Sequence, residues 1–189
     1  MPPGIRRLCV AYGIESPRDD GGGGEPTGAE RAAAELRGTV AFTGVCASLG
    51  LNRMLLDRDS AGQVGLLPVG IDEPRVVSAL VEELPRALDE LNVRCRLAIH
   101  EGVTTLAAGG FGGSAVAKVR RLAQSPPLRA ALAEHPRARL AVLLSAPVFE
   151  AIDPELPADQ FRPVDIADCG LGGPSVPGDI AWIFVPGRP

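Results

Sequence analysis

The sequence is poor in several residue types that mark particular classes of protein. Aromatic residues make up 4% of the 189 residues, histidine occurs twice, and Lys118 is the only lysine. So few aromatic rings argue against a protein that stacks single-stranded nucleic acid, and two histidines argue against a histidine-rich metal centre. The net charge of −4 lacks the positive balance of general nucleic-acid binders. We therefore expect no nucleic-acid partner.

Long hydrophobic runs are also absent. No apolar stretch reaches the roughly 18 residues of a membrane span, and the N-terminal MPPGIRR is not followed by the apolar core of a signal peptide. These features predict no membrane association and a cytoplasmic location. The four cysteines are widely spaced and form no CxxC pair, so we interpret them as core residues rather than zinc ligands or disulfides.

What the sequence does contain is enough apolar material for one folded domain. Hydrophobic residues make up 46% of the chain, and no repeat or internal boundary divides it. We predict a single domain over residues 1–189, with a flexible Gly-rich loop at 16–26. Hydrophobic patterning and turn residues give the predicted elements. Strands are predicted at 5–15, 53–57, 63–68, 93–100, 139–144, 161–166 and 180–185, and helices at 27–49, 73–91, 115–124, 125–135 and 147–152.

The order of these elements predicts the fold class. A hairpin between the first two helices argues against a doubly wound parallel sheet and favours an α+β sandwich with a mainly antiparallel sheet flanked by helices. Its β-α-β-β-α-β beginning is the ferredoxin-like order. In the first helix, Ala33, Leu36, Val40 and Ala47 recur at helical spacing and are predicted to face the core. Residues 101–114 are predicted to be irregular.

Individual residues give weak functional signals on their own. The glycines at 109–113 precede a helix and favour a flexible loop, with phosphate binding at that helix as the alternative. His100 ends a strand on which Arg94 and Arg96 share one face, and a structural role is the favoured interpretation. Arg121 has the position of a solvated helix residue. Glu15, Asp57 and Asp59 are interpreted as exposed acids, with a magnesium site for phosphate as the alternative.

Several strings, taken together and in order, resemble a known family. Residues 96–102 (RLAIHEG) resemble the R-x-G-I-H-x-G strand of class III nucleotidyl cyclases, the adenylate and guanylate cyclase catalytic domains. Residues 113–122 (GSAVAKVRRL) resemble their G-D-x-V-N-x-A-x-R-L helix, and 142–145 (VLLS) a late strand. The strings at 66–77 and 125–132 are similar to those of small single-domain cyclase-like proteins of actinobacteria. The resemblance covers almost the whole chain.

The resemblance implies a two-metal reaction at an interface between two protomers. In the family, one aspartate on the first strand and another in the hairpin hold two divalent ions, which bind the triphosphate and activate the ribose 3′-hydroxyl. An asparagine and an arginine from the other protomer's helix orient the ribose and stabilise the transition state. The resemblance places this site on six positions: Gly13, Ala61, Gly62, Ser114, Ala117 and Arg121.

This chain departs from the family at nearly all of these positions. The two metal-binding aspartates fall on Gly13 and Ala61, which have no side-chain ligand for a hard cation. The asparagine falls on Ala117, and the base-contacting aspartate falls on Ser114. Arg121 alone keeps the family's residue, as the transition-state arginine. The resemblance therefore implies that metal-dependent cyclisation is lost or severely impaired.

Three hypotheses follow. The first is a catalytically degenerate cyclase-like domain, without cofactor, acting as a regulatory, nucleotide-sensing or protein-interaction module. It would pair with itself or with an intact cyclase homologue. The second is an active cyclase that holds Mg²⁺ or Mn²⁺ through Glu15 and Asp59, each two residues from the family position and so on the same strand face. The third is a structural or interaction protein that binds no nucleotide.

Overall fold

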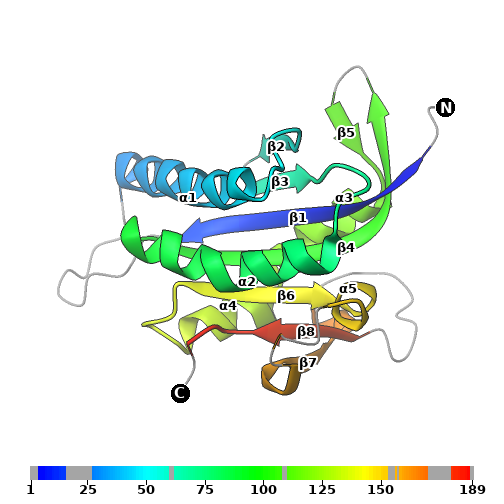
Figure 1. Ribbon diagram of the computed structural model, residues 1–189. Coiled ribbons are helices and arrows are strands. Elements are labelled where there is room, and N and C mark those ends of the chain that lie inside the picture. Colours follow the sequence, from blue (N-terminus) through cyan, green and yellow to red (C-terminus); the bar gives the residue numbers. More distant parts are fainter. Residues whose placement is uncertain are drawn as a thin grey trace.

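The strands of the chain form one mixed sheet with helices on both faces (Figure 1). This computed structural model describes residues 4–15, 27–59, 62–107, 110–152, 156, 158–169 and 180–187. The predicted loop at 16–26 and the hairpin residue Ala61 lie outside these ranges. The strands are β1 (Ile5–Glu15), β2 (Leu55–Asp59), β3 (Gly62–Leu66), β4 (Arg94–Ala107), β5 (Gly110–Gly112), β6 (Leu140–Ser145), β7 (Arg162–Asp165) and β8 (Ile180–Phe184). The helices are α1 (Gly28–Ser48), α2 (Glu73–Glu90), α3 (Ser114–Ala123), α4 (Pro126–Ala133) and α5 (Ala146–Glu150), with short 3-10 turns η1 (Ala158–Gln160) and η2 (Ile166–Cys169).

The sheet confirms the predicted α+β class. Its strand order is β2-β3-β1-β4-β6-β8-β7, with β5 paired to β4. Among the described strands the pairings are antiparallel, except for β4 with β6, which is parallel. The chain begins β1-α1-β2-β3-α2-β4, which is the predicted ferredoxin-like order.

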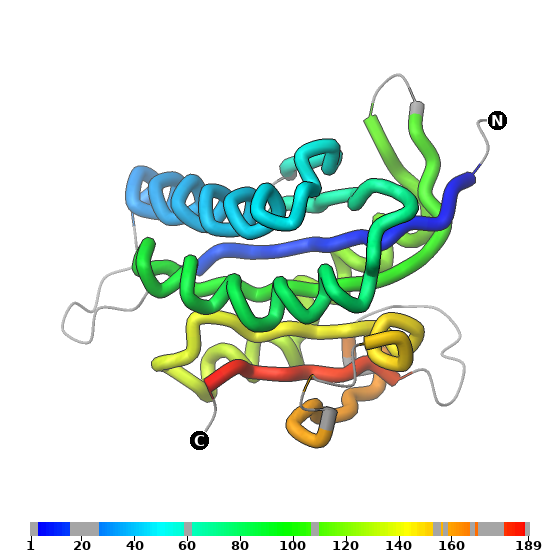
Figure 2. Tube along the Cα trace, viewed as in Figure 1, coloured from blue at the N-terminus to red at the C-terminus, as the bar shows by residue number. Residues whose placement is uncertain are grey.

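Two hydrophobic cores lie on the two faces of the sheet. Alternate residues of β1 point to opposite faces, so that Leu8, Val10 and Tyr12 enter one core and Cys9 and Ala11 enter the other. The first core is covered by α1 and α2, which lie side by side (Figure 2). The second core is covered by α3 and α4. All four cysteines are buried and unpaired, as predicted for core residues.

The prediction for the core-facing side of α1 is wrong. The predicted side points to solvent, with Leu36 66% and Val40 54% exposed. Instead, Phe42 packs against the Tyr12 ring at a centroid distance of 4.4 Å, and Gly38 lies against the Ile14 side chain. Alanine is frequent all around this helix, so the apolar spacing does not distinguish its two faces.

Strand boundaries needed three further corrections. The predicted irregular segment at 101–114 is mostly strand, because β4 continues to Ala107 and turns into β5. In the hairpin, the two strands predicted at 53–57 and 63–68 lie at Leu55–Asp59 and Gly62–Leu66, with Asp59 opposite Gly62. The strand predicted at 161–166 is shorter, since η2 begins at Ile166.

Candidate functional site

The first family position, Gly13, lies near the end of β1 on the face covered by α3 and α4. Residues of β1 two apart share a face, and Cys9 and Ala11 belong to the core under α3. In the β1–β4 register Gly13 is directly opposite Arg96, and Glu15 is opposite Arg94. The end of β1 therefore faces two arginines of β4.

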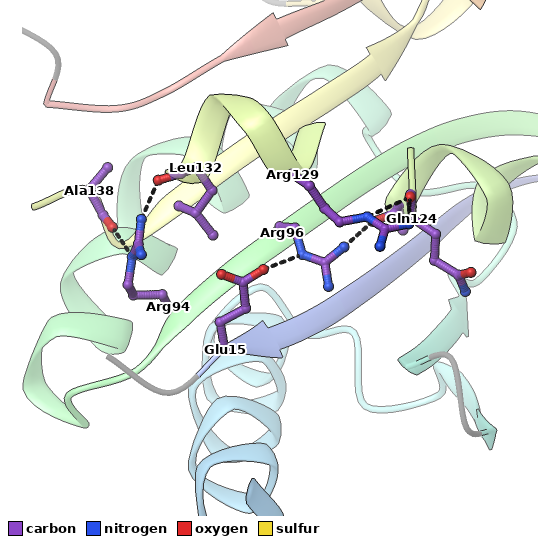
Figure 3. A network of polar contacts seen from close by, with 8 residues as sticks. Glu15, Arg94, Arg96, Gln124, Arg129, Leu132 and Ala138 are labelled. Atoms are coloured by element: carbon purple, nitrogen blue, oxygen red, sulfur yellow. Dashed lines mark hydrogen bonds and ion pairs between the residues drawn. The ribbon is translucent and has the colours of Figure 1, made fainter. Parts of the chain in front are cut away.

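The Arg96 guanidinium lies over Gly13. A Cβ atom built on Gly13 would be 3.0 Å from Nη2 of Arg96 and 3.5 Å from its Cζ. Arg96 Nε forms an ion pair with Glu15 Oε1 at 2.7 Å, and Nη1 donates to the carbonyl of Ala123 at 3.1 Å (Figure 3). The Arg96 side chain is only 15% exposed. A nearly buried cation thus occupies the space beside the position of the family's first metal ligand.

The β2–β3 hairpin closes tightly against β1 and α3. Gly62 has φ +137°, and a Cβ atom on it would lie 2.5 Å from the Tyr12 carbonyl oxygen, so only glycine fits there. Arg120 of α3 forms an ion pair with Asp57 of β2 at 2.9 Å. The cavity between β1, β3 and α3 has a volume of about 10 Å³. That space holds at most one water molecule, so this cavity, as the described residues line it, has no room for a nucleotide.

The family positions on α3 point the other way. Ser114, Ala117 and Arg121 share the exposed face of α3, whereas Val119 and Leu122 face the sheet. Arg121 Nε donates to the Ala117 carbonyl, at 3.3 Å within its own helix. Within one chain the structure therefore separates these three residues from Gly13, and they face whatever lies outside the protomer.

Two of the three acids considered as alternative metal ligands form ion pairs with arginines. Glu15 is paired with Arg96, and Asp57 is paired with Arg120. The side chain of Asp59 lies outside the described part of the structure. Among the described residues, no three histidine, cysteine, aspartate or glutamate side chains are grouped to hold a metal ion. The donor set at the end of β1 does not fit the family's two-metal centre, because Gly13 has no side-chain ligand and Glu15 is already paired with a cation.

His100 has a structural environment. It is 8% exposed, and its Nδ1 lies 2.9 Å from Ser145 Oγ, which is itself buried. The thiols of Cys9 on β1 and Cys95 on β4 are also buried, and burial raises the pKa of each to about 12. These two thiols are therefore protonated near neutral pH, and a protonated thiol is a poor nucleophile.

Sequence reasoning missed the roles of Arg96 and Arg120. The alternation of residues 93–100 indicates that Arg94 and Arg96 share a face, but it does not identify their partners. The sequence also gave no sign of a larger cavity, about 640 Å³, between the end of α4 and strands β7 and β8. Stacked rings of Phe161 and Phe184 line it, with Glu134, His135 and Arg162 around them.

Solved structures identify the fold. The chain matches an adenylate/guanylate cyclase/hydrolase from Silicibacter pomeroyi with 18% identity and a TM-score of 0.59, over 97% of this chain and 99% of that one. It matches the guanylyl cyclase Cya2 with 15% identity and a TM-score of 0.51, over 98% and 93%. A dimeric guanylyl cyclase domain of the RhoGC fusion protein from the aquatic fungus Blastocladiella emersonii matches with 10% identity and a TM-score of 0.58, over 100% and 99%.

The comparisons by sequence give no family. No family model matches the chain, and no curated protein matches it. At these identities the structural matches establish the fold, which is that of class III adenylate and guanylate cyclase catalytic domains. Within the described residues, no helix combines the length and the apolar character of a membrane span.

Proposed function

We propose that this chain is a catalytically degenerate class III nucleotidyl cyclase-like domain that acts as a regulatory, nucleotide-sensing or protein-interaction module. The observation that carries the proposal is Gly13, which has no side-chain ligand where the resemblance places a metal-binding aspartate, in a chain with the cyclase fold. A triphosphate carries about four negative charges, and the family reaction depends on divalent ions to neutralise them. The end of β1 offers a divalent ion no free carboxylate among its described side chains.

The competing cyclase hypothesis needs Glu15 and Asp59 as metal ligands. The pairing of Glu15 with Arg96 argues against it, because a divalent ion would have to displace a nearly buried guanidinium at 2.7 Å. The single negative charge of Glu15 would then lie between the guanidinium and a divalent ion, and it offsets only part of their three positive charges. The degenerate module is therefore the better account of these residues.

The exposed face of α3 is where we expect a partner protomer to bind. Ser114, Ala117 and Arg121 face outward, where a second protomer would meet them. We propose that the partner is a second copy of this chain or an intact cyclase homologue, and that Arg121 reaches the partner's site. The cytoplasmic location and the actinobacterial kinship are expectations from the sequence.

A product assay tests the proposal directly. The purified chain is incubated with ATP, GTP, CTP or UTP and Mn²⁺, which tolerates imperfect ligand geometry better than Mg²⁺, and cyclic nucleotides are measured by mass spectrometry. We expect no cyclic product above a no-protein blank, while an active cyclase domain in parallel makes one. A cyclic product that disappears in Arg121→Ala would refute the proposal and support the cyclase hypothesis.

A further inference from the structure

The cavity of about 640 Å³ lies between the end of α4 and strands β7 and β8. These two strands form the edge of the sheet opposite the β2–β3 hairpin (Figure 1), and none of the described family positions lines the cavity. Pockets that hold small organic molecules have volumes of about 300–1,000 Å³. The cavity therefore has room for such a molecule, away from the positions that the cyclase resemblance identifies.

The floor of the cavity is apolar and rich in aromatic rings. Phe161 stacks on Phe184 at a centroid distance of 4.8 Å and contacts Phe149, which stacks on Trp182. This cluster holds four of the seven aromatic residues in the sequence. The buried residues that line the cavity are Ala131, Phe161, Ile183, Phe184 and Val185. Such a floor suits a ligand with an apolar ring system.

The α4 wall of the cavity is held in place by side-chain hydrogen bonds. Arg94 Nη2 donates to the Leu132 carbonyl (Figure 3) and, at 3.1 Å, to the His135 carbonyl. His135 Nδ1 lies 2.9 Å from the Ala131 carbonyl oxygen. Because a carbonyl only accepts, Nδ1 carries the proton, and Nε2 of the uncharged ring is an acceptor. A wall fixed in this way reduces the ordering cost of binding.

The polar rim of the cavity favours a cation. Among the described lining residues, Glu134 and Asp159 are exposed acids, and Arg162 is the one exposed residue with a fixed positive charge. The two carboxylates and His135 Nε2 are hydrogen-bond acceptors. A ligand that donates N–H groups and carries positive charge complements this rim, whereas a polyanion such as a nucleoside triphosphate is repelled.

We propose that the cavity binds a small aromatic amine, an organic molecule with a flat apolar ring system and a cationic nitrogen. The ring system lies against the floor to which Phe161 and Phe184 contribute, and the amine is bound by the carboxylates of Glu134 and Asp159. The site is distinct from the family positions on β1 and α3. It does not depend on whether the chain makes a cyclic nucleotide.

Three indole compounds that differ in charge test the proposal. Tryptamine is a cation, tryptophol is neutral and indole-3-acetate is an anion, and each is titrated with the full chain by saturation-transfer difference NMR. We expect tryptamine to bind with a dissociation constant of about 0.1–1 mM, as is typical of a ligand of its size. We expect indole-3-acetate to bind about tenfold more weakly, with tryptophol in between. Absence of tryptamine binding in the millimolar range, or binding of indole-3-acetate as tight as that of tryptamine, would overturn the proposal.

The double variant Glu134→Gln/Asp159→Asn tests the location of the site. Both side chains are exposed and keep their size, so the fold is retained. We expect tryptamine to bind about five- to tenfold more weakly and tryptophol to change by less than about twofold. The matched control is Glu82→Gln/Glu83→Gln, which changes the net charge equally at two exposed acids of α2 that do not line the cavity. Equal weakening of tryptamine in the two double variants would refute the site, because only the net charge would then matter.

These outcomes are separate from those of the product assay. Tryptamine binding at the cavity of a chain that makes a cyclic nucleotide would refute the proposed function and leave the amine site standing. Absence of binding in a chain that makes no cyclic product would refute only the amine site.

Discussion

Replacing Arg94 by methionine is expected to destabilise the chain through the loss of one buried cap. Arg94 is 7% exposed and lies on β4 two residues before Arg96. Its Nε donates to the Ala138 carbonyl at 3.0 Å, and its Nη2 donates to the Leu132 carbonyl (Figure 3). Its Nη2 also donates to the His135 carbonyl, at 3.1 Å. These carbonyls belong to the end of α4 and the connection to β6, where the helix leaves carbonyl groups without helical partners.

The structure sets the size of the effect. Methionine keeps an apolar stem but has no donor, so three acceptors lose bonds to a charged group. The carbonyls of Leu132 and His135 keep backbone donors, from the N–H groups of His135 and Ala138. The loss is therefore that of hydrogen bonds to a charged donor, about 1.5–3 kcal/mol each, and relief of the desolvated charge offsets part of the sum. We expect a net loss of about 3 kcal/mol in the free energy of unfolding. With a urea m-value of about 2–3 kcal/mol/M, the unfolding midpoint falls by about 1–1.5 M.

Urea unfolding followed by circular dichroism measures this loss, and Arg129→Met is the matched control. Arg129 is exposed, and within the described residues it donates to the Gln124 carbonyl five residues earlier, so its replacement is expected to cost less than about 0.5 kcal/mol. If Arg94→Met shifted the midpoint no more than Arg129→Met does, the cap would contribute nothing and the reasoning would be refuted.

Two further predictions concern the thiols and α1. Burial raises the pKa of Cys9, Cys46 and Cys95 from near 9 to about 12, so unfolding releases protons between these values. The free energy of unfolding is expected to hold below pH 9 and to fall as the pH rises toward 12; a flat profile in alkaline urea titrations would contradict the burial. On α1, Leu36→Glu is expected to change stability by less than about 0.5 kcal/mol, whereas Phe42→Ala loses about 3–5 kcal/mol. Thermal melts of both variants decide which face of the helix is buried.

The features that could be predicted from the sequence are those that depend on local hydrophobic alternation and turn residues. The order of elements and the shared face of Arg94 and Arg96 follow from alternation and turn residues, and both are confirmed. The buried face of α1 was wrong, because its alanines give no contrast between faces and the packing is decided by Phe42 and Gly38.

The partners of Glu15, Arg94 and Arg96 depend on how β1 pairs with β4, which the sequence does not specify. Glu15 is opposite Arg94 on the neighbouring strand, yet its ion pair is with Arg96, one diagonal step away. Alternation indicates that Arg94 and Arg96 share a face, but it shows neither that Glu15 lies on the same face nor which arginine turns toward the acid. That choice is set by carbonyls at the end of α4 and in its connection to β6, which hold Arg94.

Strand β4 has 14 residues, and insertions or deletions within it would be poorly tolerated during evolution. At about 3.3 Å per residue the strand extends about 46 Å. It carries Arg94, Arg96 and His100 on one face and Leu97 and Ile99 on the other. Deletion or insertion of one codon within it would exchange the two faces for every later residue, placing charged groups in one core and leucines in the other. Substitutions are compatible with such a strand, but gains and losses of residues are confined to the connections at its ends.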